Sequence, residues 1–246
     1  MLTRLANPGA FMRFSRLALP PLALGAAAFA VYGQYLAWFA SPADYQQGET
    51  VRIMYIHVPA AWMALFFYGI MAAAALGTLV WRHPLADVAQ RAAAPIGAAF
   101  TLVCLATGSL WGKPMWGTYW VWDARLTSVL VLFLMYCGVL TLWRAVDDPG
   151  RAARAVAILT LVGAVNIPIV KFSVDWWSTL HQGASVFRVG GPTIDPSMLR
   201  PLLVMAAAYT LFGTALHLSG MRIEILKRRV RSLTLLRAEQ LEQAAA

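Results

Sequence analysis

The chain has 246 residues, of which 60% are hydrophobic and only 13% are charged. Soluble domains are about half apolar and about a quarter charged, so a soluble domain of this length could not bury so much apolar surface. The chain is nevertheless basic, with 20 Lys and Arg residues against 11 Asp and Glu and a net charge of +9. The composition therefore predicts an integral membrane protein in which charged and apolar segments are separated along the chain.

Six apolar segments are long enough, or nearly so, to cross a bilayer as helices, which takes about 20 residues. These spans cover residues 17–40, 58–81, 92–111, 126–143, 155–170 and 199–218. The fifth span is short and contains Asn166 and Pro168, so we expect it to end in a distorted turn. The first span resembles a signal peptide at its start, but its apolar run reaches full span length, which favours an uncleaved anchor. The pattern predicts an all-α membrane protein, residues 1–246 forming a single domain of six transmembrane helices.

The basic residues are shared unequally between the two sides of this arrangement. If both termini lie on one side, that side carries fourteen of the 20 Lys and Arg residues, whereas the acids divide almost evenly. The positive-inside rule then makes both termini cytoplasmic. Residues 219–246 become a cytoplasmic amphipathic tail, which we expect to form a short helix at the inner surface in contact with anionic membrane lipid. The high positive charge is thus an orientation signal, and a nucleic-acid partner is not needed to explain it.

A dense tryptophan cluster lies in the outer connection between the third and fourth spans. Residues 111–123 read WGKPMWGTYWVWD and contain four of the ten tryptophans of the chain. These are Trp111, Trp116, Trp120 and Trp122. An interfacial aromatic belt explains single tryptophans at other span ends but not this cluster. Gly112, Pro114 and Gly117 are expected to interrupt the helix and to display the rings on a turn-rich, partly re-entrant platform for a flat apolar ligand.

Two of the four histidines are expected on the same outer face as the tryptophans. His57 opens the second span, and His181 lies in the last outer connection, whereas His83 and His217 fall on the inner side. Two imidazoles beside an aromatic platform supply what a haem needs, namely two axial nitrogens and flat apolar packing. Zinc is a less suitable alternative, because it requires further ligands. The outer acids available for zinc are Asp44, Glu49, Asp123 and Asp175.

Charged residues flank this predicted site. Asp123 and Arg125 stand at the start of the fourth span, where charges are costly unless they are paired, solvated or bound to a ligand. They either form an ion pair, with each other or with another helix, or Arg125 binds the carboxylates of a ligand. Arg52 lies five residues before His57, so Arg52 and Arg125, with Arg188 as a further candidate, could neutralise the two propionates of a haem.

Other functions are less well supported by the sequence. Cys104 and Cys137 lie inside spans and form no C-x-x-C motif, which argues against thiol–disulfide chemistry and covalent c-type haem attachment. No phosphate-binding loop is present, so an ATP-driven pump acting alone is unsupported. Two alternatives stay open: a b-type cytochrome that moves electrons through a pair formed by His83 and His217, and a structural subunit without a cofactor.

The motifs around these residues resemble a known family. Residues 116–123, WGTYWVWD, resemble the WGxxWxWD signature of the tryptophan-rich "WWD" haem-handling membrane proteins. Together with HVPAAW around His57 and FSVDWWSTLHQG around His181, they make the chain similar to the haem exporter protein C (CcmC) family of the cytochrome c maturation system. The resemblance covers nearly the whole chain.

The resemblance implies a site and a set of partners. Haem b would be held non-covalently at the periplasmic face of the bacterial inner membrane, with His57 and His181 as the axial ligands of its iron. The loop that presents haem would contain Trp111, Trp116, Trp120, Trp122 and Asp123. A periplasmic haem chaperone of the CcmE type would receive the haem through a covalent bond between its own histidine and a haem vinyl group. ABC transporter subunits of the CcmA and CcmB types and a small one-span protein of the CcmD type would complete the assembly. Such a protein is an assembly factor with lyase-like haem transfer rather than a turnover enzyme.

Overall fold

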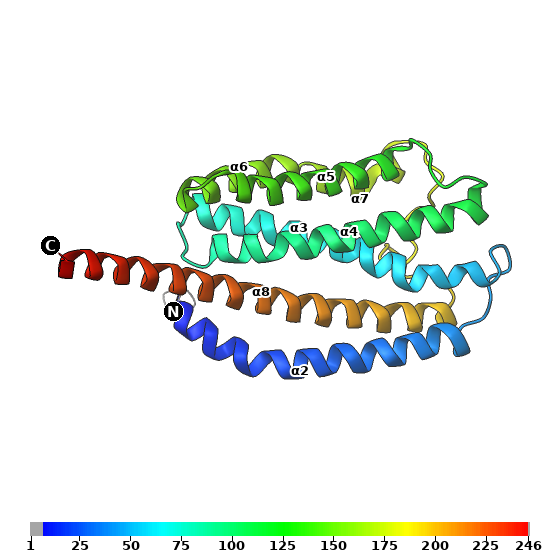
Figure 1. Cartoon of the computed structure of the whole chain (residues 1–246). Coiled ribbons are helices and arrows are strands. Elements are labelled where there is room, and N and C mark those ends of the chain that lie inside the picture. The colour runs from blue at the N-terminus through cyan, green and yellow to red at the C-terminus, as the bar shows by residue number, and fades with distance from the viewer. Residues whose placement is uncertain (1–6, 246) are drawn as a thin grey trace.

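The computed structural model describes residues 7–245, which form a bundle of long helices with no β-strand among them (Figure 1). Six helical stretches in this part of the chain are long and apolar enough to cross a membrane. The predicted all-α fold with six spans is therefore confirmed. The elements are α2 (Pro8–Tyr35), the π-helical η1 (Leu36–Ala40), the 3₁₀-helical η2 (Glu49–Ile53), α3 (Met54–Leu79), α4 (Ala86–Trp116), α5 (Ala124–Ala145), α6 (Pro149–Ala164), α7 (Asn166–Trp176) and α8 (Pro196–Ala245).

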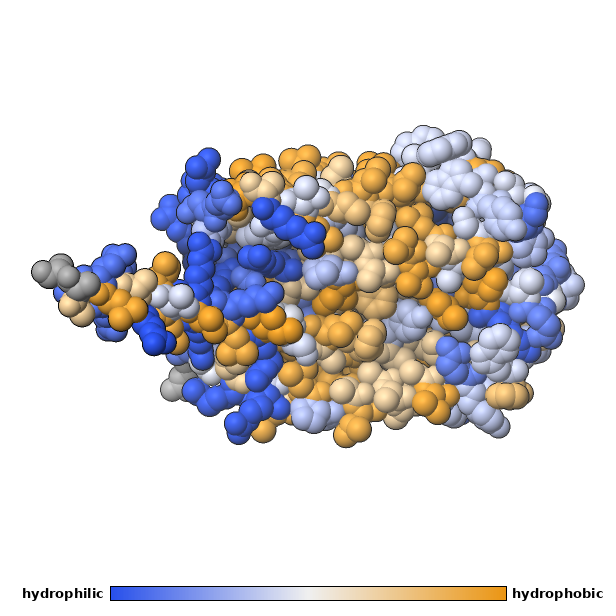
Figure 2. Space-filling view, in the orientation of Figure 1, coloured by the Kyte–Doolittle hydropathy of each residue, from blue (hydrophilic) through white to orange (hydrophobic). Residues whose placement is uncertain are grey.

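Helices α3 and α4 form the middle layer of the bundle (Figure 1). Helices α5, α6 and α7 pack on one side of this layer, and α8 packs on the other. Helix α2 contacts chiefly α8 and leaves most of its surface exposed. The end of the bundle where α2 begins and α8 ends is called the terminal end below, and the opposite end the distal end. On the face seen in Figure 2 an apolar band lies between two more hydrophilic ends, which suits a membrane-spanning protein.

Close packing of α5 and α6 against the middle layer depends on glycines that face tyrosine side chains. Tyr68 and Tyr136 are fully buried and meet edge to face, with 5.1 Å between the ring centroids. The Tyr136 hydroxyl donates a hydrogen bond of 2.7 Å to the carbonyl of Ala64. A Cβ atom added at Gly97 would collide with the Tyr136 ring, and one added at Gly163 would collide with the Tyr68 hydroxyl. Small residues at these positions let the helices approach closely, as is common in membrane bundles.

The fifth span is broken into two helices. Helix α6 ends at Ala164 and α7 begins at Asn166, so the two flank Val165. Pro168 explains the break, because it has no N–H to donate to the carbonyl of Ala164 and its ring clashes with that carbonyl in a continuous helix. The Asn166 side chain donates a hydrogen bond of 2.8 Å to the carbonyl of Ser128 on α5, which holds the break against its neighbour. The chain then continues as α7 toward the distal end (Figure 1).

The first helix begins earlier than the apolar span predicted at 17–40. Helix α2 starts at Pro8, and Asn7 caps it by accepting a hydrogen bond of 2.7 Å from the backbone N–H of Gly9. An asparagine cap followed by proline in the first turn is a favourable start for a helix. The helix therefore extends beyond the apolar span at the terminal end.

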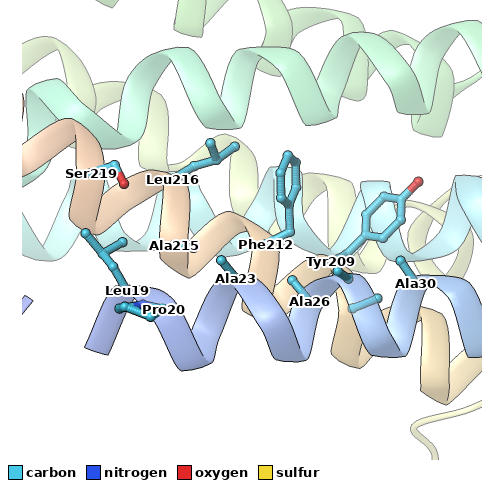
Figure 3. Close-up of a pocket in the computed structure, with 12 residues that line it drawn as sticks. Leu19, Pro20, Ala23, Ala26, Ala30, Tyr209, Phe212, Ala215, Leu216 and Ser219 are labelled. Carbon is cyan, nitrogen blue, oxygen red and sulfur yellow. The ribbon is translucent and has the colours of Figure 1, made fainter. Parts of the chain in front are cut away.

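Helices α2 and α8 meet toward both ends but leave a groove between them (Figure 3). A Cβ added at Gly33 would collide with Met205, and the Ser15 hydroxyl accepts a hydrogen bond of 2.9 Å from Arg222. Between these contacts the groove has a volume of about 790 Å³. Its walls are mostly alanine and other apolar side chains, and none of the predicted ligand-binding residues lines it. The groove is therefore separate from the candidate site.

The predicted tail does not form a helix of its own. Residues 219–245 continue α8 without a break, and from Met221 onward the described tail contains no glycine or proline that would bend it. Helix α8 contains 50 residues, so at about 1.5 Å per residue it is roughly 75 Å long, much longer than a bilayer is thick. Figure 1 shows its last part projecting straight beyond the terminal end of the bundle. The structure therefore differs from the expectation of a separate short helix, because residues 219–245 belong to α8.

Charged residues tie α8 to the start of α4 at the terminal end. Glu224 accepts hydrogen bonds from Arg91, at 3.3 Å, and from Arg228, at 2.9 Å. Arg228 also pairs with Asp87 at 2.8 Å, and the Arg91 guanidinium lies 5.1 Å from the centroid of the Trp143 ring. Each partly buried charge in this network has at least one opposite partner, which offsets its desolvation. The network marks the level at which α8 leaves the bundle.

Candidate functional site

The outer histidines and tryptophans of the sequence analysis come together at the distal end. His57 is the fourth residue of α3, and His181 lies in the connection between α7 and α8. The ring of Trp111 contacts His57, with 5.7 Å between the centroids, and the ring of Trp116 contacts His181, with 4.8 Å between the centroids. Both tryptophans belong to the last turns of α4. The end of one helix therefore carries the contacts to both imidazoles.

His57 lies in a slot formed by one face of α4. Its Nδ1 is 3.1 Å from the hydroxyl oxygen of Thr107, and the Trp111 ring meets it at an interplanar angle of 73°. A Cβ added at Gly108 would lie 2.9 Å from the Cε1 atom of His57, so only glycine leaves room for the ring in this position. Sequence reasoning missed Thr107 and Gly108. Thr107 could have been found from its spacing, because residues four apart lie on one face of a helix and Thr107 is four residues before Trp111.

Asp123 joins the start of α5 to the loop that carries His181. One carboxylate oxygen accepts a hydrogen bond of 2.7 Å from the N–H of Leu126, which caps α5. The other accepts from the N–H of Leu180 at 3.3 Å and lies 3.4 Å from Nδ1 of His181. The Asp123 side chain is nearly buried. A single carboxylate thus fixes both the helix start and the position of the second imidazole.

The surroundings of His181 keep its imidazole neutral at neutral pH. Burial lowers the pKa of His181 below its usual 6.5, because it disfavours the charged form. The nearby Asp123 carboxylate acts in the opposite sense and raises the pKa of His181, while the Arg125 cation lowers it. Burial is the largest of these effects. A neutral imidazole is the form that binds a metal ion.

The first half of the tryptophan cluster is helical, which corrects the expectation that Gly112 and Pro114 interrupt the helix. Helix α4 continues to Trp116 and ends at Gly117, which has a φ of 75° and donates a hydrogen bond of 3.0 Å to the carbonyl of Lys113. Pro114 is tolerated because only one backbone hydrogen bond is lost in the last turn. Glycine at Gly117 supplies the left-handed conformation that ends many helices. Residues 117–123 form the irregular part of the cluster.

The four tryptophans of the cluster have different environments. Trp111 donates a hydrogen bond of 2.8 Å from its indole nitrogen to the side chain of Gln47, a residue that sequence reasoning missed. Trp120 and Trp122 meet edge to face with 5.5 Å between their centroids, and Trp122 is 76% exposed. The indole N–H of Trp120 is buried, and it has no hydrogen-bond partner among residues 7–245. Four other buried side-chain polar atoms of the described residues also lack a partner, and the N–H of Trp120 is the one that lies in the tryptophan cluster, where it is free to bond to an acceptor.

Arg125 has no acidic partner in the described part of the chain. No Asp or Glu oxygen there lies within 4.0 Å of it, so the ion pair with Asp123 that the sequence left open is not formed. Asp123 instead bonds to Leu126, Leu180 and His181, as described above. The guanidinium donates hydrogen bonds to the Ser173 hydroxyl, at 3.1 Å, and to the Lys171 carbonyl, at 3.4 Å. A half-buried cation held only by neutral groups remains able to bind an anion.

Arg52 is more heavily engaged than Arg125. Its side chain forms a salt bridge with Glu49 and donates hydrogen bonds to the carbonyls of Ala37 and Ser41. It also lies 5.8 Å from the centroid of the Trp38 ring. These contacts join η1 to η2. The third cation considered for the site, Arg188, is exposed in the connection before α8.

The other two histidines, His83 and His217, lie in different elements with different contacts. His83 lies in the turn between α3 and α4, where its Nδ1 accepts a hydrogen bond of 3.2 Å from the N–H of Leu85. His217 lies within α8 and packs against Phe67, with 5.9 Å between the ring centroids. Within residues 7–245 no three His, Cys, Asp or Glu side chains converge as the coordination of zinc requires. The distal end offers two imidazoles, the Arg125 cation, which has no acidic partner among the described residues, and several aromatic rings.

Comparisons with known proteins identify the family to which the chain is similar. The model of the family described as "Heme exporter protein C" matches residues 1–236. A protein named heme exporter protein C from Bradyrhizobium diazoefficiens is 64% identical over 237 residues, which cover 96% of this chain and 90% of that protein. The protein of the same name from Escherichia coli K12 is 47% identical and covers 92% of this chain and 91% of its own length. A putative cytochrome c biosynthesis ccmC-like mitochondrial protein from Marchantia polymorpha is 49% identical over 71% of this chain and 74% of its own length.

Proposed function

Because the chain belongs to the heme exporter protein C family, we propose that its distal end binds haem between His57 and His181 and presents it to a partner. Family membership assigns the chain to haem transport in cytochrome c maturation, and its six helical spans make it a multi-pass membrane protein. The observation that carries the proposal is the pair of imidazoles, each in contact with a tryptophan of α4. Trp111 and Trp116 are five residues apart, a rise of about 7.5 Å along the helix.

The residues present fit a haem. Bis-histidine ligation requires two neutral imidazoles, and a porphyrin plane gains affinity from packing against aromatic rings. The carboxylates of the propionates are suitable acceptors for Arg125, which lacks an acidic partner among the described residues, and for the unpaired indole N–H of Trp120. Arg52 is a second propionate partner in this proposal, although several of its donors already bind the protein. Haem b, bound without a covalent bond, is the cargo that suits this set of donors.

The partner is a periplasmic haem chaperone of the CcmE type. The exposed ring of Trp122 and the half-exposed ring of Tyr119 offer an aromatic surface at which such a chaperone can meet the edge of the haem. Its histidine would add across a haem vinyl group, so that a carbon–nitrogen bond forms while the N–H proton passes to the other vinyl carbon. This addition needs no oxidant. The tryptophan loop and Asp123 serve to hold the haem in place while the chaperone binds.

The distribution of Lys and Arg residues indicates which side of the membrane the site faces. Fourteen of the 20 Lys and Arg residues belong to the terminal side, which supports a cytoplasmic terminal end and a periplasmic distal end in the bacterial inner membrane.

ABC transporter subunits of the CcmA and CcmB types and a one-span protein of the CcmD type complete the proposed assembly. ATP hydrolysis by the transporter would drive release of the loaded chaperone.

Absorption spectra of the purified protein with added haem test the proposal. We expect a low-spin, six-coordinate spectrum that is lost in His57→Ala and in His181→Ala, because either change removes one axial ligand. The matched controls are His83→Ala and His217→Ala, which should retain the parent spectrum. Retention of the low-spin spectrum in the first two variants, together with its loss in His83→Ala or His217→Ala, would establish the cytochrome alternative instead. Absence of any bound haem in the parent protein would leave the structural subunit.

A further inference from the structure

We propose that Thr107 is a positioning residue that holds His57 with its Nε2 atom free for the haem iron. The proposal rests on the proposed function, since it gives His57 the role of an axial ligand. Neither the sequence motifs nor the family description involves Thr107. It lies one turn before Trp111 on α4 and is half-buried against α3. Its hydroxyl is 3.1 Å from Nδ1 of His57, which is 50 residues away in the chain.

The hydrogen bonds of Thr107 determine which nitrogen of His57 carries the proton. The Thr107 hydroxyl donates to the carbonyl of Val103 at 2.6 Å, the usual bond of a helical threonine to the residue four positions earlier. A hydroxyl has one hydrogen, so its oxygen can only accept from the imidazole. Nδ1 of His57 must therefore carry the hydrogen. In the neutral ring Nε2 is then the atom with the free lone pair.

The slot around His57 fixes the orientation of the ring as well as its tautomer. The close approach to Gly108 and the edge of Trp111 limit rotation of the ring, and the Thr107 bond holds its Nδ1 side against α4. His181 receives the same kind of support from Asp123 through its own Nδ1 atom. Ligating histidines commonly donate their second nitrogen to such a partner, and loss of that partner costs roughly 10–100-fold in metal affinity.

Thr107→Val tests the proposal because valine keeps the shape of threonine and removes only the hydroxyl. We expect a roughly 10–100-fold weaker affinity for haem and a mixture of low-spin and high-spin spectra. Thr107→Ser should keep the parent affinity for haem and the low-spin spectrum, since serine keeps the hydroxyl oxygen that accepts the hydrogen bond from His57. Thr101→Val is the matched control: the Thr101 hydroxyl donates to the carbonyl of Gly97 at 2.7 Å in the same way but accepts no bond from a histidine. That variant should keep the parent affinity and spectrum.

A second measurement needs no haem. The nitrogen-15 chemical shifts of His57 in the haem-free protein report its tautomer, and we expect only the form protonated at Nδ1 in the parent and in Thr107→Ser. In Thr107→Val both tautomers should be populated. A single tautomer that is unchanged in Thr107→Val, with unchanged haem affinity, would overturn the role of Thr107.

The failure of this inference can be told apart from failure of the proposed function. If His57→Ala keeps the low-spin spectrum, His57 is not a ligand and the proposed function itself is wrong. If His57→Ala loses that spectrum while Thr107→Val keeps it, only the role of Thr107 is wrong. Because Thr107 is proposed to act through His57, adding Thr107→Val to His57→Ala should weaken haem binding no further. An additional loss of haem affinity in the double variant would show that Thr107 acts elsewhere and would contradict the proposal.

Discussion

At the scale of single residues, small groups around the imidazoles decide how the site is built. Asp123 ends the tryptophan loop, caps α5 and lies beside His181, so one side chain joins three parts of the distal end. Thr107 and Gly108, which are neighbours in one turn of α4, both contact the His57 ring and fix its position. The positions of both imidazoles therefore depend on the side chains and the glycine that surround them.

Gly108→Ala should displace His57 from its slot. The added Cβ would lie 2.9 Å from Cε1 of the ring, closer than real Cβ contacts allow, so the imidazole has to move away from α4. We expect weaker haem binding, measured by titration of the purified protein with haem. Gly69→Ala is the control, since nothing lies within 4 Å of a Cβ at that position. Equal haem affinity in Gly108→Ala and the parent would mean that the slot does not set the position of His57.

Asp123→Asn should lower the pKa of His181 in the haem-free protein. Burial already holds the pKa of His181 below 6.5, and the carboxylate partly opposes that effect, so its removal lets the pKa fall further. The His181 side chain binds a proton more readily in the unfolded chain than in the folded one. The free energy of unfolding that depends on neutral His181 is therefore fully present above pH 6.5 and is lost as the pH falls below that value. NMR titration of the labelled imidazole measures the shift. A higher pKa in Asp123→Asn would contradict this account.

At the scale of elements, the tail is a continuation of α8 and not a separate surface helix. Ile223, Leu226, Val230 and Leu233 form an exposed apolar stripe on it at helical spacing. Figure 1 shows the last part of α8 projecting straight beyond the terminal end of the bundle. The contact with anionic lipid that its composition predicts stays a prediction, and it depends on whether the helix remains straight at the membrane.

A spin label at Leu233→Cys distinguishes the two positions of the tail. We expect the label to collide more often with a water-soluble relaxation agent than with oxygen dissolved in lipid, because the residue stands beyond the bundle in water. A label at Phe212→Cys, on the groove between α2 and α8, should show the opposite preference. Lipid-like collision rates at Leu233 would show that the tail bends onto the membrane. Both labels require the native Cys104 and Cys137 to be replaced.

At the scale of the whole molecule, the bundle separates two chemically different ends. The terminal end holds the salt-bridge network of α4 and α8, and the distal end holds the imidazoles and exposed aromatic rings. Figure 2 shows the apolar band that keeps these ends apart. The proposed haem site at one end and the charged network at the other would suit the proposed work with partners on both sides of a membrane.

Labelling of single cysteines by a maleimide that cannot cross membranes tests the proposed orientation. Val189→Cys, at a residue that is 99% exposed in the distal connection, should react in intact spheroplasts. Leu241→Cys, near the end of α8, should react only after the membrane is opened. The label should follow this pattern because the positive-inside rule places the terminal end in the cytoplasm. The reverse pattern would invert the topology and place the candidate site on the cytoplasmic side.

The sequence alone determined the features that depend on local composition. Long apolar runs predict spans, the bias of Lys and Arg predicts orientation, and the spacing of WGTYWVWD indicates the family. The sequence also indicated which types of residue belong to the candidate site, because histidines and tryptophans on one side of a membrane already suggest a haem. The end of α4 was misjudged, because a single proline in the last turn of a helix costs less than its local preference implies.

Only the tertiary structure decided which side chains act together. The bonds from His57 to Thr107, from Arg125 to Ser173 and from Asp123 to His181 each join residues 48 or more positions apart. Such pairs depend on which faces of the packed helices meet. Neither the helix propensity of the residues nor their hydrophobic periodicity specifies which faces these are. For the same reason the sequence left the partner of Arg125 open, whereas the packing of α5 against α7 supplies neutral groups in place of a carboxylate.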